Sequence, residues 1–300
     1  MDDPGRDAEL LEALAPAATR LLAEHLEARK PWYSHELIPW GLGEDYRERP
    51  WAPDQVSVSP AARTSLEVNL LTEDNLPYYH LAFQRLVGGD GPFAAWNRRW
   101  TAEEAGHAQA IRDYLLVTRN TDPVALEDAR VATMTAGWYP RLPNCANLFV
   151  YTAAQELATR ISHRNAGKLA DEPVAYELFS KIASDENHHF IFYRGIVTAM
   201  LAEAPSLAVQ AIAKQFGEFR MPGTGIPGFM RKAAAMARAG VYNMRIHLDQ
   251  VLAPLVRQWN LPGLTGLSSA GREAQENVFH ILDRVRVQAE KAEARGAISA

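Results

Sequence analysis

The pattern Glu-x-x-His occurs twice in the sequence, as Glu104 with His107 and as Glu186 with His189. On a helix, residues three positions apart lie on the same face about one turn from each other, so both side chains can bind the same or neighbouring metal ions. One such pair has little meaning by itself, because chance is expected to produce about one of them at ordinary composition in a protein with nine histidines. The surrounding sequence therefore decides the interpretation.

A single glutamate precedes each pair by the length of one helical hairpin. Glu73 lies 31 residues before Glu104, and Glu156 lies 30 residues before Glu186. Both occur in apolar helical segments, where a carboxylate is costly to bury unless it is paired or bound to metal. Ferritin-like di-iron bundles use this order of ligands, and four carboxylates balance the charge of two Fe(II) ions. The sequence predicts a site for two iron ions with the ligands Glu73, Glu104, His107, Glu156, Glu186 and His189; oxygen and imidazole ligands suit iron or manganese.

The elements that position these residues are predicted to be helices. Apolar residues recur at intervals of three and four, and alternating runs typical of strands are scarce. Gly and Pro divide the chain into expected helices at about 6–29, 60–87, 93–119, 123–136, 144–169, 173–202, 205–219, 226–258 and 268–296. We expect an all-α fold with one helical domain over 1–300. Residues 1–58 would form an N-terminal helix and an extended wrapping segment, in which Trp32, Trp40 and Trp51 dock on the bundle; residues 59–300 would form the bundle and C-terminal helices.

Composition excludes several classes of protein. The net charge of -5 argues against nucleic-acid binding. Cys145 is the single cysteine, which excludes an intramolecular disulfide and a cage of thiolate ligands. The first thirty residues do not resemble a secretory signal, and no apolar run has the length of a transmembrane helix. We therefore expect a soluble cytoplasmic protein without a membrane span.

Four segments around the expected ligands resemble the soluble acyl-[acyl-carrier-protein] desaturases of plant plastids and actinobacteria. They are LLTEDNLPYYH, RRWTAEEAGHA, QELATRISH and ASDENHH, and the similarity extends from WYSHELIP to LTGLSSAGREAQ. The resemblance implies a homodimeric helical bundle in which Glu104 and Glu186 bridge two irons, Glu73 and His107 complete one iron, and Glu156 and His189 complete the other. It also implies oxygen-dependent desaturation of an acyl chain on acyl carrier protein, with electrons from a ferredoxin-type donor.

The resemblance further implies roles for residues beside the metal. Asp185 would orient His107 and link it to Trp32, and Asp74 is a candidate partner of His189. Thr159 would lie beside the oxygen site, although a bond from its hydroxyl back to a helix carbonyl is an equal alternative. His80 and His163 share helix faces with ligands, and we expect them to have structural or outer-sphere roles.

The substrate would need an apolar tunnel and a docking surface. Ala82, Leu86, Leu148 and Phe149 lie at helical spacing from the ligands, so they line such a tunnel or are plain core residues. A cationic surface for the acidic carrier protein is available from Arg98, Arg99, Arg231, Lys232 and Arg238.

The sequence departs from the family pattern between Glu104 and His107. Family members generally carry Asn-Arg there, and this chain has Ala105 and Gly106. Two other functions therefore stay open. The first is hydroxylation or another oxidation of a carrier-bound substrate at the same di-iron site. The second is a non-catalytic, ferritin-like metal-binding protein.

Overall fold

Helices make up all of the regular secondary structure in the computed structural model, which describes residues 4–298. This agrees with the predicted all-α class. The long helices are α1 (Pro4–Ala28), α3 (Pro60–Asp74), α4 (Leu76–Val87), α5 (Gly91–Val117), α6 (Pro123–Ala136), α7 (Cys145–Ala170), α8 (Pro173–Glu203), α9 (Pro205–Glu218), α10 (Phe229–Arg238) and α13 (Ser269–Ile298). Short helical segments are α2 (Ser34–Leu37), α11 (Met244–Ile246), α12 (Ala253–Gln258), the 3₁₀ turns η1 (Trp40–Leu42), η2 (Pro53–Gln55) and η4 (Leu261–Gly263), and the π-helical η3 (His247–Leu252).

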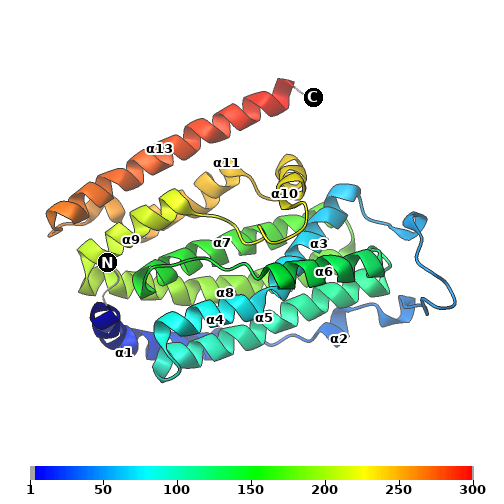
Figure 1. The fold of residues 1–300 in the computed structure, drawn as a ribbon, viewed down its shortest axis with the longest axis horizontal. Helices are drawn as coiled ribbons and strands as arrows, with labels where there is room; N and C mark the ends of the chain where they lie inside the picture. Colours follow the sequence, from blue (N-terminus) through cyan, green and yellow to red (C-terminus); the bar gives the residue numbers. More distant parts are fainter. Residues whose placement is uncertain (1–3, 299–300) are drawn as a thin grey trace.

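Helices α5, α7 and α8 run roughly along the long axis of the molecule (Figure 1). Two apolar clusters pack around them. One joins these helices to α1, α4 and α9, and its residues on α8 extend from Phe190 to Leu201. The other joins them to α3, and its residues on α8 end at Ile182. Glu186 and His189 therefore lie on α8 between two apolar clusters, which is where a buried polar site can be enclosed.

The predicted helix 60–87 is two helices. Pro77 has no backbone N–H and cannot bond to the carbonyl of Glu73, so α3 ends at Asp74 and α4 starts at Leu76. The side chain of Asn75 at this break donates to the Trp138 carbonyl oxygen over 2.6 Å. The break places Glu73 in the last turn of α3.

The predicted helix 226–258 is also interrupted. Helix α10 ends at Arg238, and Gly240 has a φ of 76°, a left-handed conformation that favours glycine. Farther along, Pro254 lacks the N–H that an α-helix needs, and the turn before it is the π-helical η3.

Residues 30–59 form the expected irregular segment along the bundle, and two of its three tryptophans dock. Trp32 donates its indole N–H to Asp185 over 2.8 Å, and Trp51 donates to the Arg119 carbonyl oxygen over 3.0 Å. The expectation for Trp40 is wrong, because its side chain is 48% exposed and donates only to the nearby His35 carbonyl.

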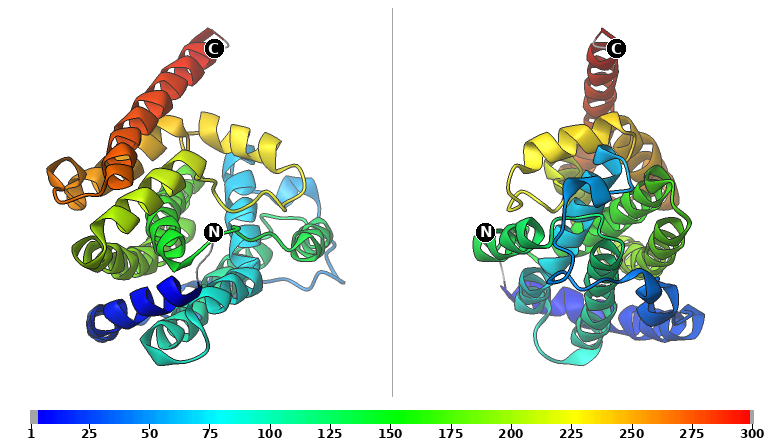
Figure 2. Two further views of the ribbon diagram at one scale, coloured as in Figure 1. Left: turned by 60° about the vertical axis from the view of Figure 1, so that its left-hand side comes forward. Right: turned by 90° about the vertical axis from the view of Figure 1, so that its right-hand side faces the viewer.

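Helix α13 packs against α9 and, nearer its C-terminal end, against α11, where Arg245 forms an ion pair with Glu293; its last residues extend beyond the bundle (Figure 2). None of the helices within residues 4–298 combines the length and the apolar character that crossing a membrane requires.

Candidate metal centre

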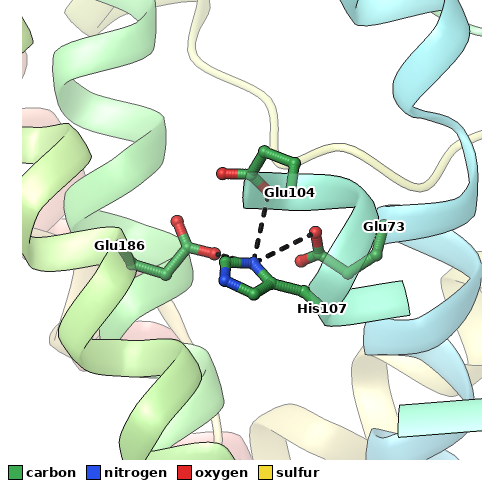
Figure 3. A group of neighbouring side chains, drawn as sticks. All are labelled: Glu73, Glu104, His107 and Glu186. Atoms are coloured by element: carbon green, nitrogen blue, oxygen red, sulfur yellow. Dashed lines mark ion pairs between the residues drawn. The ribbon is translucent and has the colours of Figure 1, made fainter. Parts of the chain in front are cut away.

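Six buried side chains from four helices form two overlapping groups. Glu73, Glu104, His107 and Glu186 each offer one ligand atom, and these atoms all lie within 4.8 Å of one another. Figure 3 shows their convergence from α3, α5 and α8. The second group, with the same spacing limit, is Glu104, Glu156, Glu186 and His189. The structure thus brings together all six residues that the sequence predicted, with Glu104 and Glu186 common to both groups.

Local contacts hold the helices that carry these side chains. Glu172 caps the start of α8 by accepting from the backbone N–H groups of Val174 and Ala175 over 3.0 and 2.8 Å. The same carboxylate accepts from the Tyr114 hydroxyl of α5 over 3.0 Å. This cap therefore connects the two helices that carry the Glu-x-x-His pairs.

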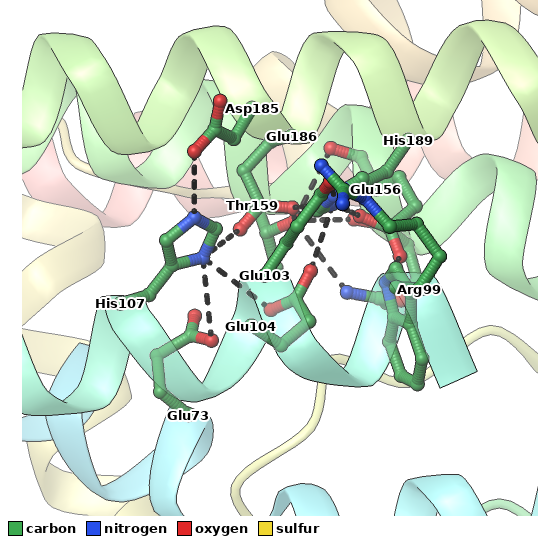
Figure 4. Close-up of polar contacts among 12 residues, drawn as sticks. Glu73, Arg99, Glu103, Glu104, His107, Glu156, Thr159, Asp185, Glu186 and His189 are labelled. Carbon is green, nitrogen blue, oxygen red and sulfur yellow. Dashed lines mark hydrogen bonds and ion pairs between the residues drawn. The ribbon is translucent and has the colours of Figure 1, made fainter. Parts of the chain in front are cut away.

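His107 directs one ring nitrogen to the carboxylates and the other to Asp185 (Figure 4). Its Nδ1 lies 3.5 Å from both Glu104 and Glu186, and 3.9 Å from Glu73. Its Nε2 lies 3.3 Å from Asp185 Oδ2, the same oxygen that accepts from Trp32. Asp185 and Trp32 therefore lie where an outer partner can fix the orientation of this imidazole.

His189 has the same arrangement with a different carboxylate. Its Nδ1 lies 2.8 Å from Glu104 and 3.6 Å from Glu156, and its Nε2 lies 2.9 Å from Glu103 Oε2. The expectation of Asp74 as its partner is wrong, because Asp74 forms an ion pair with Arg112 of α5. The sequence held a signal for Glu103: an acid directly precedes Glu104, just as Asp185 directly precedes Glu186.

Three further side chains contact the cluster. The Thr159 hydroxyl lies 3.1 Å from Glu186 Oε2 and also 3.1 Å from the Glu156 carbonyl oxygen; the second contact is the bond to a helix carbonyl that the sequence offered as one of two alternatives. Trp100 donates its indole N–H to Glu156 over 3.0 Å. His163 Nε2 lies 3.0 Å from Glu73 Oε1.

The protonation of the cluster responds to its burial. Burial and the adjacent Glu104 carboxylate raise the pKa of Glu73 to about 8, and burial with Glu186 raises the pKa of Glu156 well above its usual range. Burial opposes the protonation of His107, but its hydrogen bond to Asp185 and the adjacent Glu104 carboxylate raise its pKa well above the ordinary value. The residues therefore hold protons that a bound cation would displace.

The donor atoms fit a pair of iron ions. Buried oxygens of Glu104, Glu156 and Glu186, together with Nδ1 of His107 and of His189, make no hydrogen bond of acceptable geometry. Buried polar atoms are normally satisfied, so such a group of unsatisfied atoms aimed at one another is explained by metal coordination. Carboxylate oxygen and imidazole nitrogen are suitable ligands for iron. The buried Glu and His clusters are consistent with a di-iron site.

Two small cavities border the cluster. One, of about 30 Å³, is lined mainly by apolar side chains, including Ala82 and Leu148, and reaches Trp100 beside the metal centre. The other, of about 70 Å³, is lined by Glu73 and Thr159. Leu86 and Phe149, which the sequence also offered as tunnel residues, do not line either cavity; Phe149 is fully buried in the core.

Several known proteins are similar to this chain in sequence, and one solved structure is similar to it in fold. The family model described as fatty acid desaturase matches residues 6–300. DesA1 of Mycobacterium tuberculosis, whose name assigns it provisionally to the acyl-[acyl-carrier-protein] desaturases, is 39% identical over 96% of this chain and 88% of its own length. The chloroplastic stearoyl-[acyl-carrier-protein] 9-desaturase of Spinacia oleracea is 31% identical over 97% of this chain and 78% of its own length.

A crystal structure supports the same assignment. The X-ray structure of DesA2 from Mycobacterium tuberculosis H37Rv, also named provisionally as an acyl-ACP desaturase, superimposes with a TM-score of 0.72. The two chains are 27% identical, and the match covers 89% of this chain and 99% of the other. With a family model matching nearly the whole chain and a buried cluster of four carboxylates and two imidazoles, the protein belongs to the acyl-[acyl-carrier-protein] desaturase family.

Proposed function

We propose that the protein is an enzyme that uses a di-iron centre and dioxygen to desaturate an acyl chain carried on acyl carrier protein. The observation that carries this proposal is the enclosed cluster of six ligand residues beside an apolar cavity. Its iron ligands would be Glu73, Glu104, His107, Glu156, Glu186 and His189. An iron pair bound there supplies the oxidation of an unreactive C–H bond by dioxygen, with electrons from an external donor of the ferredoxin type.

The side chains of the protein would orient the ligands and exclude water. Asp185 and Glu103 accept from the Nε2–H groups of the two imidazoles, which leaves each Nδ1 deprotonated toward the metal. The Thr159 hydroxyl, at 3.1 Å from Glu186, can hold or pass a proton at Oγ1. Apolar residues such as Ala82 and Leu148 would surround the acyl chain and keep bulk water from the reacting carbons.

Helix α10 is the element that we assign to carrier binding. Its inner residues Phe229, Ala233 and Met236 line the cavity that contains Glu73, and its Arg231 and Arg238 are exposed. A carrier protein docked on these cations would therefore stand beside an entry to the metal centre.

Two other expected docking cations do not belong to this surface. The N-terminal end of α5, which carries Arg98 and Arg99, lies on the opposite side of the molecule from α10 (Figures 1 and 2). In addition, Arg99 forms an ion pair with the buried Glu103.

The remaining proposals concern the assembly, the location and the domain organisation of the protein. We propose a homodimer that acts in the cytoplasm, and a single helical domain over 1–300 in which α1 and the wrapping segment pack on the bundle. Limited proteolysis tests the domain, and analytical ultracentrifugation tests the dimer. We expect proteolysis to leave a single protease-resistant fragment that contains the whole bundle. We expect ultracentrifugation to give the mass of two chains.

The form of the substrate provides the test of the proposed function. The iron-loaded protein should convert acyl chains attached to carrier protein and leave the corresponding free fatty acids unreacted, because binding of the remote carrier positions a featureless chain. Replacing Arg231 and Arg238 with alanine should raise KM for the acylated carrier. The matched Arg98→Ala variant should keep the wild-type KM. Equal turnover of free acids and carrier-bound chains would contradict the assignment of the carrier.

A further inference from the structure

Glu103 lies in a pocket of positively charged or donor groups from three helices. Its carboxylate is 3.0 Å from Nε2 of His25 on α1, and 3.0 Å from Nε of Arg29, which directly follows the end of that helix. Arg99 of α5 forms a third contact, and His189 of α8 lies 2.9 Å from Oε2 (Figure 4). The Glu103 side chain is only 3% exposed, so these four groups replace water as its environment.

His25 is built into the core rather than attached to the surface. The residue is 5% exposed, and its ring stacks on His189 with centroids 5.9 Å apart. The Trp96 indole meets it edge-on, with centroids 5.0 Å apart and an interplanar angle of 89°. An imidazole with one nitrogen on Glu103 and its face on His189 is therefore held in one orientation.

The close packing of α1 against α8 explains how His25 reaches this position. Gly195 of α8 faces Leu21 of α1, and a Cβ atom at Gly195 would lie 2.7 Å from the Leu21 side chain. Glycine therefore permits the approach of the two helices. Leu14 and Ala18 of α1 are fully buried in the same apolar cluster, which fixes the helix along its length.

The same stretch of chain also reaches the other imidazole. Trp32, seven residues after His25, donates to Asp185, the outer partner of His107. Its ring lies parallel to that of His107, with centroids 6.4 Å apart and an interplanar angle of 8°. Each metal-facing imidazole therefore has an outer carboxylate and a ring from residues 25–32, which we call the N-terminal clamp.

We propose that His25 and Arg29 act through Glu103 on His189, as the counterpart of the link from Trp32 through Asp185 to His107 that the family resemblance already implies, so that the N-terminal clamp positions both imidazoles for metal binding. His25 and Arg29 are positioning residues, because they touch neither substrate nor the expected metal positions. The proposal rests on the metal site of the proposed function, but it is independent of the reaction catalysed there. It predicts that loss of His25 or Arg29 weakens the ion bound by His189, and that loss of Trp32 weakens the ion bound by His107.

Metal titration tests this separation without reference to turnover. Co(II) is added to the metal-free protein, and its visible absorption reports the number and affinity of the bound ions. His25→Phe keeps an aromatic ring against Trp96 but removes the donor to Glu103, so one ion should bind about 10–100-fold more weakly. His25→Gln, which retains an N–H donor, should restore most of the affinity. His188→Phe is the matched control, because the His188 ring packs edge-on against His25 but forms no hydrogen bond or ion pair with Glu103.

Combining the two substitutions shows whether His25 and Trp32 support different ions of the metal site. Trp32→Phe should weaken one ion, and the double variant His25→Phe/Trp32→Phe should weaken both. If the double variant still holds one ion with wild-type affinity, the two residues act on the same half and the clamp proposal is wrong. Wild-type affinity for both ions in His25→Phe would also overturn it.

A second substitution distinguishes weaker metal binding from a failure of the variant to fold. Arg29 is partly exposed, with a side-chain exposure of 16%, and Arg29→Leu removes its ion pair with Glu103 while leaving His25 in place. If His25→Phe does not fold, a folded Arg29→Leu variant should still show weaker binding of one ion, and unchanged binding would contradict the proposal. A folded wild-type chain that binds no metal would instead overturn the metal site of the proposed function.

Discussion

His163 Nε2 lies 3.0 Å from Glu73 Oε1 and 3.5 Å from Glu186 Oε1, so a third buried imidazole reaches the carboxylate cluster. Burial opposes protonation of this ring, but its hydrogen bonds to Glu186 and Glu73 raise the pKa of His163 to about 9. A protonated His163 therefore donates to Glu73 and balances part of the negative charge, in the outer role that the sequence favoured over direct ligation.

Replacing His163 with phenylalanine should lower the metal content of the purified protein, because Glu73 loses the donor that fixes its orientation. His163→Gln should retain most of the metal, since its amide can also donate. Elemental analysis after gel filtration measures the difference. His80→Phe is the matched control, because His80 contacts Thr101 outside the cluster. Full occupancy in His163→Phe would show that other contacts position Glu73.

Substitution of a shared carboxylate should have a larger effect than substitution of a terminal one. Glu104 and Glu186 belong to both ligand groups, whereas Glu73 belongs to one. Glu104→Ala and Glu186→Ala should therefore lose most of both irons, and Glu73→Ala should retain about one iron per chain. Iron analysis of reconstituted protein checks this ranking. Undiminished iron in both Glu104→Ala and Glu186→Ala would contradict the assignment of the site.

Gly106 should tolerate alanine. Its position in α5 is exposed, and an added Cβ atom would meet no atom within 4 Å. Alanine at an unstrained internal helix position stabilises by about 0.5–1 kcal/mol, so Gly106→Ala should raise Tm by about 1–3 °C. Iron content and product should stay unchanged, because Glu104 and His107 keep their spacing. A large loss of activity with iron still bound would show that this glycine makes room for a substrate or a partner.

His247 should make stability sensitive to acid. Burial lowers the pKa of His247 to about 4 from an ordinary value of 6.5. Below about pH 6.5 the unfolded chain takes up a proton that the folded chain refuses, so this group destabilises the fold progressively as the pH falls toward 4. The full effect is of the order of 3 kcal/mol.

Denaturant unfolding at pH 7 and at pH 4.5 measures that effect. The wild type should lose more stability between these two values than His247→Gln, which has no proton to gain. Gln can still accept from Tyr242, whose hydroxyl lies 2.7 Å from His247 Nδ1. The same pH dependence in both proteins would show that His247 is not excluded from protonation in the fold.

The sequence predicted which side chains converge because the pattern is local. Glu104 with His107, and Glu186 with His189, share helix faces through three-residue spacing, and the helix period alone requires this. The partners beyond them depend on contacts between distant segments. Asp74 was expected near His189 and instead pairs with Arg112, while Glu103 receives His25 from 78 residues away. The spacing of residues within one helix does not show which other helices will pack beside it, so these partners could not be predicted.

The sequence contained signals for two helix ends that the predicted ranges did not take into account. Pro77 and Gly240 are visible in the sequence, and each marks an interruption within a predicted helix. By contrast, the exposure of Trp40 could not be read from its type, because a large apolar side chain in an irregular segment is expected to dock. Its neighbours Trp32 and Trp51 find buried acceptors, and Trp40 finds only a local carbonyl.

The mass of the acyl product shows whether the protein desaturates its substrate. Iron-loaded protein is incubated with acylated carrier protein, dioxygen and a reduced ferredoxin, and the released acyl chain is analysed by mass spectrometry, with Glu186→Ala as the inactive control. We expect a product lighter than the substrate by two hydrogen atoms. A product heavier by one oxygen atom would indicate hydroxylation at the same site, and an unchanged acyl chain with iron fully bound would contradict the assignment of the protein as a desaturase.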